Sequence, residues 1–217
     1  MRMFDARKIL AAEFPLSEVI EYIQGGGVII HPTETVYGLG GVPERHVIDR
    51  IVSLKKRTSS KPMLLLIPDR NSAEGLHWTQ EASALADAFW PGPLTIVLAD
   101  IRSHYCSTVR NSKGGVAVRV SPHPLVEILV RELGHPIVST SANVSGDCPP
   151  LEIDKSEGEN KSFLEEDIWA LDFGRLPYSL PSTVIDCSQG IPKIIREGAI
   201  PLSEIARLIP KSMKIHG

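Results

Sequence analysis

The chain has 217 residues, of which 42% are hydrophobic and 23% charged, a balance typical of a globular protein that buries its own core. A formal net charge of −3 argues against a protein that binds nucleic acids through a global positive charge. The three cysteines form no CxxC pair, and the N-terminus lacks the apolar run of a signal peptide. No apolar stretch approaches the roughly 20 residues of a membrane span. These three observations predict a cytoplasmic protein without membrane attachment.

The first half of the chain alternates helical and strand patterns. Apolar residues at helical spacing occupy 16–23, and Gly25–Gly27 stop this helix before a short buried strand, Val28–Ile30. A second helical pattern over 47–54 runs into a basic cluster, and a second buried strand follows at Met63–Ile67.

The second half repeats this alternation. In chain order, its predicted elements are a helix around 85–89, strands at 94–98 and 116–120, a helix at 125–133, strands at 137–138, 168–171, 184–185 and 193–195, and a helix at 205–209. Helices that alternate with strands predict an α/β fold built on one twisted sheet. The acidic segment 151–167 is expected to be a solvated loop rather than a functional lid.

The most informative stretch is Pro136–Gly146, in which a short apolar lead runs into a cluster of hydroxyls and an amide. Its polar members are Ser139, Thr140, Ser141, Asn143 and Ser145. Hydroxyls and amides both donate and accept hydrogen bonds, and ligands of open α/β sheets lie beyond the carboxyl ends of strands. The stretch is therefore either a ligand site or a turn whose side chains bond their own backbone.

Residues 31–40, with the sequence HPTETVYGLG, place a second polar group after a buried strand. Pro32 keeps the chain extended, and Gly38 and Gly40 permit a tight path. The polar residues are Thr33, Glu34, Thr35 and Tyr37. These groups need partners, which either a ligand or the capping of a strand-to-helix connection supplies.

Residues 55–61, with the sequence KKRTSSK, hold four cations: Lys55, Lys56, Arg57 and Lys61. Either a phosphate clamp or a solvated helix C-terminus explains such a run, because arginine binds phosphate oxygens in pairs and cations favour helix C-termini. The run is not a P-loop, since no G-x-x-x-x-G-K-[ST] sequence is present.

Single polar residues on apolar strands add weaker candidates. Arg119, among Val and Ala, suits either an edge-strand salt bridge or a substrate carboxylate. Ser182 and Arg196 end apolar strands, and each alone is more typical of a turn or surface residue. His31 and His135 are expected to pack or cap, and neither a histidine pair with zinc-site spacing nor a G-x-S-x-G elbow occurs.

Seven motifs follow one another along the chain: PTETVYGLG, KxR…KP, WPGPLT, VAVRVxPHP, TSANxSG, STVID and IIREG. Their order resembles that of the YrdC-like family of threonylcarbamoyl-adenylate synthases, over nearly the whole chain. The resemblance implies a YrdC-like α/β fold, in which a twisted mixed β-sheet with flanking helices surrounds a large basic cavity. It also implies a YrdC-like domain over 13–200 and a C-terminal helix and tail over 201–217, as in the short, single-domain family form.

The same resemblance implies an enzyme of the nucleotidyltransferase class, an L-threonylcarbamoyladenylate synthase. It would join L-threonine, bicarbonate and ATP to give threonylcarbamoyl-adenylate and pyrophosphate, with Mg²⁺ on the nucleotide and no metal ligand from the protein. Partner proteins with threonylcarbamoyl-transferase activity would then pass the group to adenosine 37 of tRNA, the t6A modification. tRNA itself is a further candidate partner.

The resemblance also assigns roles to individual residues. For L-threonine these are Thr33, Arg119, Ser139 and Ser182, and for ATP they are Arg57, Lys61, Ser141, Asn143 and Arg196. Lys55 would join Arg57 and Lys61 in holding phosphates. Four positions mark true synthases in the family, and all four are present here: Lys55, Arg57, Ser141 and Asn143.

Two positions depart from the family pattern, since Pro149 stands where a hydroxyl is common and Gly115 where a threonine is common. Two alternative functions stay open: an RNA-binding or ribosome-maturation module of the same fold, and a diverged paralogue with other carbamoyl-adenylate chemistry. The net charge of −3 argues against the first alternative. The complete set of four marker residues argues against the second.

Overall fold

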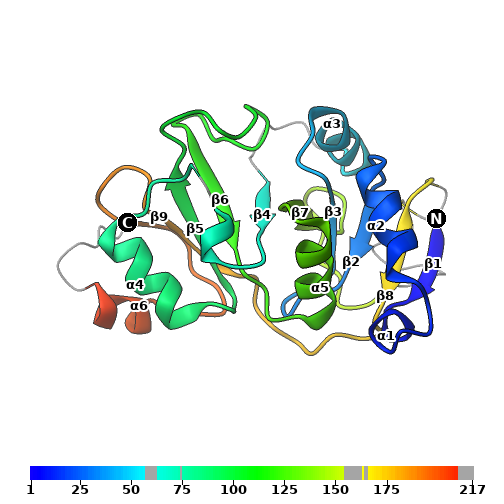
Figure 1. Ribbon diagram of the computed structural model, residues 1–217. Helices are drawn as coiled ribbons and strands as arrows, with labels where there is room; N and C mark the ends of the chain where they lie inside the picture. The colour runs from blue at the N-terminus through cyan, green and yellow to red at the C-terminus, as the bar shows by residue number, and fades with distance from the viewer. Residues whose placement is uncertain (57–62, 74, 154–162, 164–165, 210–217) are drawn as a thin grey trace.

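One mixed sheet runs through the molecule (Figure 1). The computed structural model describes residues 1–56, 63–73, 75–153, 163 and 166–209. In this part of the chain the sheet has ten strands, in the order β1-β8-β2-β3-β7-β4-β6-β5-β9-β10. The strands are β1 (Arg2–Asp5), β2 (Ile29–His31), β3 (Gly38–Gly41), β4 (Leu64–Leu66), β5 (Leu94–Ala99), β6 (Gly115–Arg119), β7 (Ile137–Ser141), β8 (Trp169–Asp172), β9 (Thr183–Asp186) and β10 (Lys193–Arg196).

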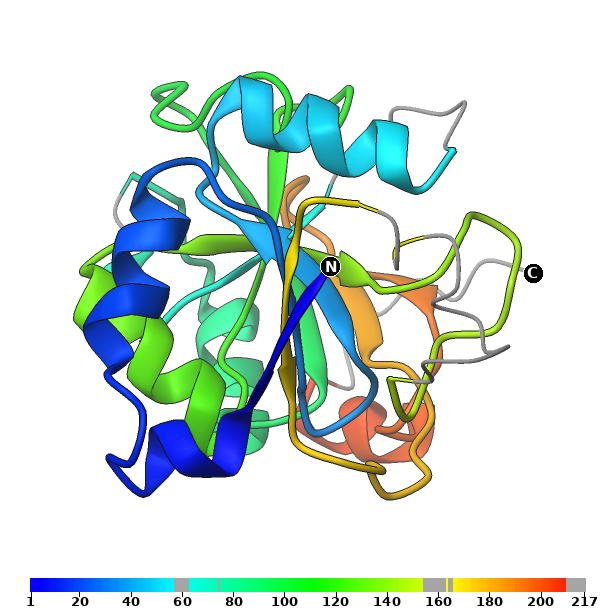
Figure 2. The same cartoon turned by 90° about the vertical axis from the view of Figure 1, so that its right-hand side faces the viewer.

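The helices of the described chain pack their apolar faces against this sheet. They are α1 (Ala6–Leu10), α2 (Leu16–Gln24), α3 (Arg45–Leu54), α4 (Gln80–Phe89), α5 (Pro124–Leu133) and α6 (Leu202–Leu208). In α3, Val47, Ile51 and Leu54 are buried because three- and four-residue steps bring them to one face. Both α1 and α2 contact α5, and Figure 2 shows α2 and α5 on the same side of the strands.

The predicted α/β fold with a mixed sheet and flanking helices is confirmed. The helices from α2 to α6 lie where the apolar periodicity predicts them, whereas α1 has no such prediction. The caps of α4 and α5 explain where these helices begin and end. Thr79 accepts a hydrogen bond from the Ala82 amide, at 3.1 Å, at the start of α4. Gly134 ends α5 in the left-handed conformation, with a φ of 69°.

The first three polar residues of the cluster, Ser139, Thr140 and Ser141, lie within a strand, so the prediction that they follow the strand is wrong. β7 pairs with β3 over 138–141 and with β4 over 137–139. Asn143 and Ser145 lie beyond the strand, as expected.

The elements at the N-terminus and at the glycines near residue 40 have no clear signal in the sequence. β1 pairs in parallel with β8, a partner far along the chain. β3 consists of Gly38, Leu39, Gly40 and Gly41, a composition that is rare in strands. β1 and α1 precede residue 13, the expected start of the YrdC-like domain, yet β1 joins the sheet and α1 contacts α5 and β8. The boundaries 13–200 and 201–217 stay predictions.

The acidic segment 151–167 is anchored to the core at two of its described residues. Ile153 is 8% exposed and Phe163 is fully buried, so the expectation of a solvated loop does not hold at these two residues. Whether the segment acts as a lid depends on residues 154–162 and 164–165, which lie outside the described chain. Among the described residues, no helix has both the length and the apolar character needed to cross a membrane.

Candidate functional site

A cavity of about 630 Å³ opens on one face of the sheet. Its size lies within the range of small-molecule sites, roughly 300–1,000 Å³. The strand register explains the lining, because side chains directly opposite one another project from the same face. Val97 on β5 pairs with Ala117 on β6 and with Asp186 on β9, and all three side chains line the cavity.

Six of the ten predicted site residues line this cavity: Thr33, Arg119, Ser139, Ser141, Ser182 and Arg196. They come from segments that are far apart along the chain, and the sheet order brings them together. Arg57 and Lys61 lie outside the described residues. The charged members of the described lining are Arg119, Arg196 and Asp186, so the strongly basic character expected of the cavity stays a prediction.

Arg119 is buried at the base of the cavity and forms an ion pair with Glu34. Ser121 donates to the other oxygen of the Glu34 carboxylate at 2.5 Å, and the Arg119 Nη2 atom lies 3.3 Å from the Thr35 hydroxyl. Burial lowers the pKa of Arg119, whereas the charge of Glu34 opposes this shift. The Arg119 Nε atom is buried with no hydrogen-bond partner in the described chain, so the guanidinium keeps donor capacity beyond its bond to Glu34.

Thr33 lines the cavity, but its hydroxyl is engaged in its own turn. It donates to the Val36 carbonyl at 2.7 Å and accepts from the amides of Thr35 and Val36, each at 3.1 Å. This is the local capping that the sequence offered as the alternative for the 31–40 segment. The direct contact between Thr33 and L-threonine stays a prediction.

Ser139 and His31 form a hydrogen-bonded pair beside the cavity. The Ser139 hydroxyl lies 3.1 Å from the Nε2 atom of His31, and His31 is fully buried. His31 packs, as the sequence suggested, but the sequence analysis missed its contact with a cavity residue. A polar side chain at the end of an otherwise apolar strand was the signal for such a contact, although it does not identify the partner.

Lys55 and Asn143 shape the turn after β7 instead of lining the cavity. The buried Lys55 ammonium donates to the carbonyl oxygens of Ser141 and Asn143, the second at 2.7 Å. The Asn143 side-chain amide donates to the carbonyls of Val144 and Asp147, both at 2.8 Å. The phosphate contact of Lys55 and the nucleotide contact of Asn143 stay predictions.

Ser182 and Arg196 are hydrogen-bonded to each other, although the family resemblance assigned them to different substrates. The Arg196 Nη2 atom donates to the Ser182 carbonyl at 2.7 Å and lies 3.2 Å from the Ser182 hydroxyl. Thr95, which the sequence analysis missed, lies 2.9 Å from the same hydroxyl. The Ser182–Arg196 pair therefore links a residue expected to contact L-threonine to a residue expected to contact ATP.

The two departures from the family pattern lie at this cavity. Pro149 is part of its lining. At Gly115, an added Cβ atom would lie 2.8 Å from the side-chain nitrogen of Asn111, which also lines the cavity. The Asn111 amide oxygen accepts from the amides of Lys113 and Gly115, so its nitrogen is the atom left to donate into this space.

Comparison with known proteins identifies relatives of this chain. The model of the Sua5, YciO and YrdC family, which carries the description "Telomere recombination", matches residues 21–198. Threonylcarbamoyl-AMP synthase of Pyrococcus abyssi (strain GE5 / Orsay) is 34% identical over 201 residues, which cover 90% of this chain and 57% of that protein. The chain thus spans little more than half the length of this curated relative.

Solved structures that bear the names of the same family also match this chain. Sua5 of P. abyssi in complex with L-threonine matches with a TM-score of 0.84 and 30% identity, over 99% of this chain and 61% of that one. YciO of E. coli matches with a TM-score of 0.75 over 94% of this chain and 97% of its own, and at 23% identity it supports the fold alone. The chain therefore belongs to the Sua5/YciO/YrdC family.

Proposed function

We propose that this chain is a threonylcarbamoyl-AMP synthase that makes threonylcarbamoyl-adenylate from L-threonine, bicarbonate and ATP. The observation that carries the proposal is the cavity in which Arg119, two serines of β7 and the Ser182–Arg196 pair converge. Sua5 of P. abyssi, which has the same fold, is known in complex with L-threonine, and the curated P. abyssi relative carries the activity in its name. Since the chain spans 57% of the named relative, the activity of the whole protein is a proposal here.

In the proposed site, L-threonine occupies the end formed by Thr33, Arg119, Ser139 and Ser182. Arg119 would bind the carboxylate, because its charged guanidinium lines the cavity and has more N–H donors than Glu34 and Thr35 occupy. ATP would occupy the end formed by Ser141 and Arg196, next to the turn that holds Asn143, with Arg57, Lys61 and Lys55 assigned to the phosphates by family resemblance. The hydrogen bond between Arg196 and Ser182 supports the proposal that these two ends adjoin.

The proposed reaction has two steps. The amine of L-threonine adds to bicarbonate and releases water to give a carbamate, whose oxygen then attacks the α-phosphorus of ATP while pyrophosphate leaves. An adenylyl group is transferred, so the proposed class is nucleotidyltransferase. Such chemistry depends on the positioning of the reactants and on cations near the phosphates, and it needs no covalent intermediate on the protein.

Mg²⁺ is proposed to enter the site with the phosphates of ATP, where it would neutralise their charge. In the part of the chain that the structure describes, no group of three or more His, Cys, Asp and Glu side chains is placed to hold a metal ion. The wider context stays a proposal as well: a cytoplasmic reaction, threonylcarbamoyl-transferase partner proteins and the t6A modification of tRNA.

The test is pyrophosphate release by the purified full-length chain. We expect release only when ATP, Mg²⁺, L-threonine and bicarbonate are all present, with L-serine and glycine as matched controls for the amino acid. Release without threonine and bicarbonate would contradict the proposal, as would no release under any condition with partner proteins added. Binding of RNA by a chain that releases no pyrophosphate would favour the RNA-binding alternative.

A further inference from the structure

A histidine reaches the proposed threonine end of the cavity across β3, a strand rich in glycine. His31 lies on β2, Ser139 lies on β7, and β3 lies between them. An added Cβ atom at Gly38 would lie 2.7 Å from the Ser139 hydroxyl and 2.8 Å from His31 Nε2. At Gly40 it would lie 3.2 Å from the same nitrogen. The glycines of β3 thus leave the space in which the imidazole contacts Ser139.

The hydrogen bonds of His31 determine where its proton lies. The Nδ1 atom lies 3.2 Å from the Pro32 carbonyl oxygen, which can only accept, so Nδ1 carries the hydrogen. Burial lowers the pKa of His31 to about 4, and the nearby charge of Arg119 acts in the same direction, so the ring is neutral at pH 7. Nε2 therefore has no hydrogen and accepts the hydrogen of the Ser139 hydroxyl.

This arrangement fixes the direction of the Ser139 hydroxyl. Its hydrogen points to His31, so its oxygen presents only lone pairs to the cavity that it lines. A ligand group at this point must then be an N–H or O–H donor. We propose that His31 is a positioning residue that makes Ser139 an acceptor toward the cavity, and that the site thereby selects the ammonium or hydroxyl group of its amino-acid substrate.

This inference rests on the proposed function, because it assigns the Ser139 end of the cavity to L-threonine. A hydroxyl that rotates freely serves donors and acceptors alike, whereas a fixed one favours donors. His31 itself does not act as a base in this proposal. The ring donates and accepts within the protein, and it holds Ser139 without touching the substrate.

The direct test is the tautomer of His31, read from ¹⁵N chemical shifts and two-bond couplings of the imidazole in the ligand-free protein. We expect the hydrogen on Nδ1 and none on Nε2 at pH 7. An Nε2–H tautomer or a charged ring would overturn the inference. This measurement needs no substrate, so it decides the geometry even if the proposed function fails.

The functional test is calorimetric titration of L-threonine and of ATP into four variants. We expect His31→Phe to weaken threonine binding about 5- to 10-fold, the value of one well-placed hydrogen bond, and to change ATP binding less than about 2-fold. His31→Gln should recover most of the affinity, because its amide oxygen can accept the Ser139 hydrogen. In a Ser139→Ala background, His31→Phe should add no further loss.

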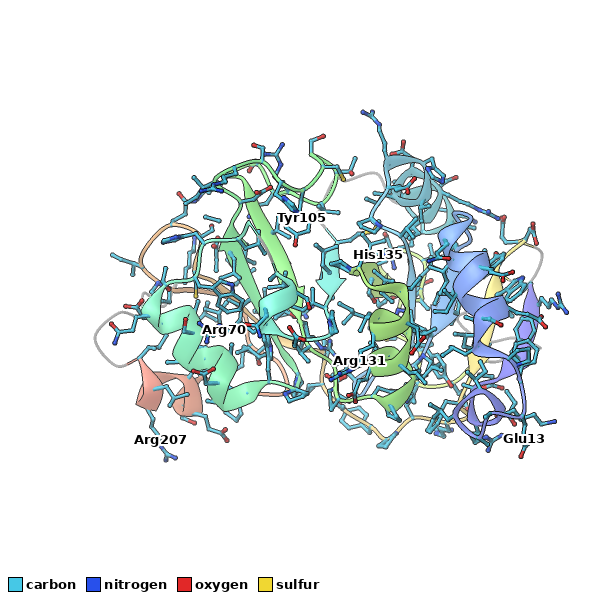
Figure 3. All side chains as sticks on the ribbon, viewed as in Figure 1. Glu13, Arg70, Tyr105, Arg131, His135 and Arg207 are labelled. Carbon is cyan, nitrogen blue, oxygen red and sulfur yellow. The ribbon has the colours of Figure 1, made fainter. Side chains whose placement is uncertain are left out.

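His135→Phe is the matched control. His135 (Figure 3) also precedes a proline and its Nδ1 atom lies 3.0 Å from that proline's carbonyl, but it is not among the residues lining the cavity. It should leave the affinity for threonine unchanged. Should His31→Phe fail to fold, Gly38→Ala replaces it, since the added methyl separates His31 from Ser139 while both residues stay.

Three outcomes would overturn the inference while the wild type still binds threonine. These are an unchanged threonine affinity in His31→Phe, a His31→Gln variant as weak as His31→Phe, and an undiminished effect of His31→Phe when Ser139 is already alanine. A wild type that binds no threonine at all would count against the proposed function instead.

Discussion

Arg119 brings a positive charge into the interior, where Glu34 lies within hydrogen-bond reach of it. The arginine therefore has a partner before any substrate arrives, and Ser121 holds the far oxygen of that partner. A guanidinium has five N–H donors, so it can bind Glu34 and a substrate carboxylate together. Glu34 orients Arg119 and offsets part of the cost of burying its charge.

We predict that Arg119→Ala weakens L-threonine binding by about 2–5 kcal/mol, the loss typical when one partner of a buried charge pair is removed. ATP binding should change far less. The measurement is titration calorimetry with each ligand. Because the single variant leaves Glu34 without its charged partner, Arg119→Ala combined with Glu34→Gln is the matched variant. Equal losses of affinity for both ligands would show that Arg119 does not bind the carboxylate.

Residue types marked candidate side chains and the family resemblance assigned them to one cavity, but neither shows what each one bonds. Arg119 stands out because a polar group on an apolar strand needs a partner, whereas Ser182 is a weak candidate without the resemblance. Their partners Glu34 and Thr95 come from other strands or loops, and no local pattern encodes such pairings. His31 was taken for a packing residue, since its partner Ser139 becomes a neighbour only when β3 folds between them.

At the scale of elements, Lys55 connects the end of α3 to the end of β7. The chain leaves α3 at Lys55, whose side chain bonds two carbonyls of the turn at 141–143, and whose own carbonyl accepts from the Ser145 amide at 3.0 Å. The conformation of the turn that presents Ser141 to the cavity therefore depends on a residue from another element.

We predict that Lys55→Met lowers the free energy of unfolding by about 1–3 kcal/mol, because it leaves two buried carbonyl groups without their charged donor. Chemical denaturation measures this change. Lys56→Met is the matched control, since Lys56 is exposed, and it should stay within about 0.5 kcal/mol of the wild type. If Lys55→Met unfolds like the wild type but binds ATP weakly, Lys55 contacts the phosphates rather than the turn.

Helices were predicted more completely than strands, for a physical reason. A helix is closed by hydrogen bonds within one segment, so the apolar spacing of α2 or α5 is sufficient to find it. A strand needs a partner, and β1 and β3 exist because β8 and β7 offer them one. The polar half of β7 is likewise a strand because all three of its residues pair with β3, and Ser139 also pairs with β4.

At the scale of the whole molecule, the sheet order is what makes the site. It sets β3, β7, β4, β6, β5, β9 and β10 side by side, so residues from Thr33 to Arg196 share one cavity. The sequence motifs follow one another along the chain, but their meeting depends on crossovers that no local pattern encodes. The family resemblance predicted the cavity, whereas apolar periodicity predicts single elements and not the space that they enclose.

The burial of His31 makes the stability of the whole fold depend on pH. Its pKa is about 4 in the folded chain, against about 6.5 for an unperturbed histidine. Between these values the unfolded chain binds a proton that the folded chain does not, so the free energy of unfolding rises with pH through this window. The stabilisation is present above about pH 6.5 and is lost as the pH falls toward 4. The charges near His31 belong to Arg119 and His123, and both disfavour its protonation.

We predict that the wild type loses about 1–2 kcal/mol of unfolding free energy through His31 when the pH falls from 7 to 5. His31→Gln has no group to titrate at this position, so its loss over the same interval should be smaller by that amount. Urea denaturation at the two pH values measures both losses, and the comparison removes the titrations that the two proteins share. Equal losses in the wild type and His31→Gln would mean that His31 is not held neutral by burial, because only a shifted pKa couples its proton to folding.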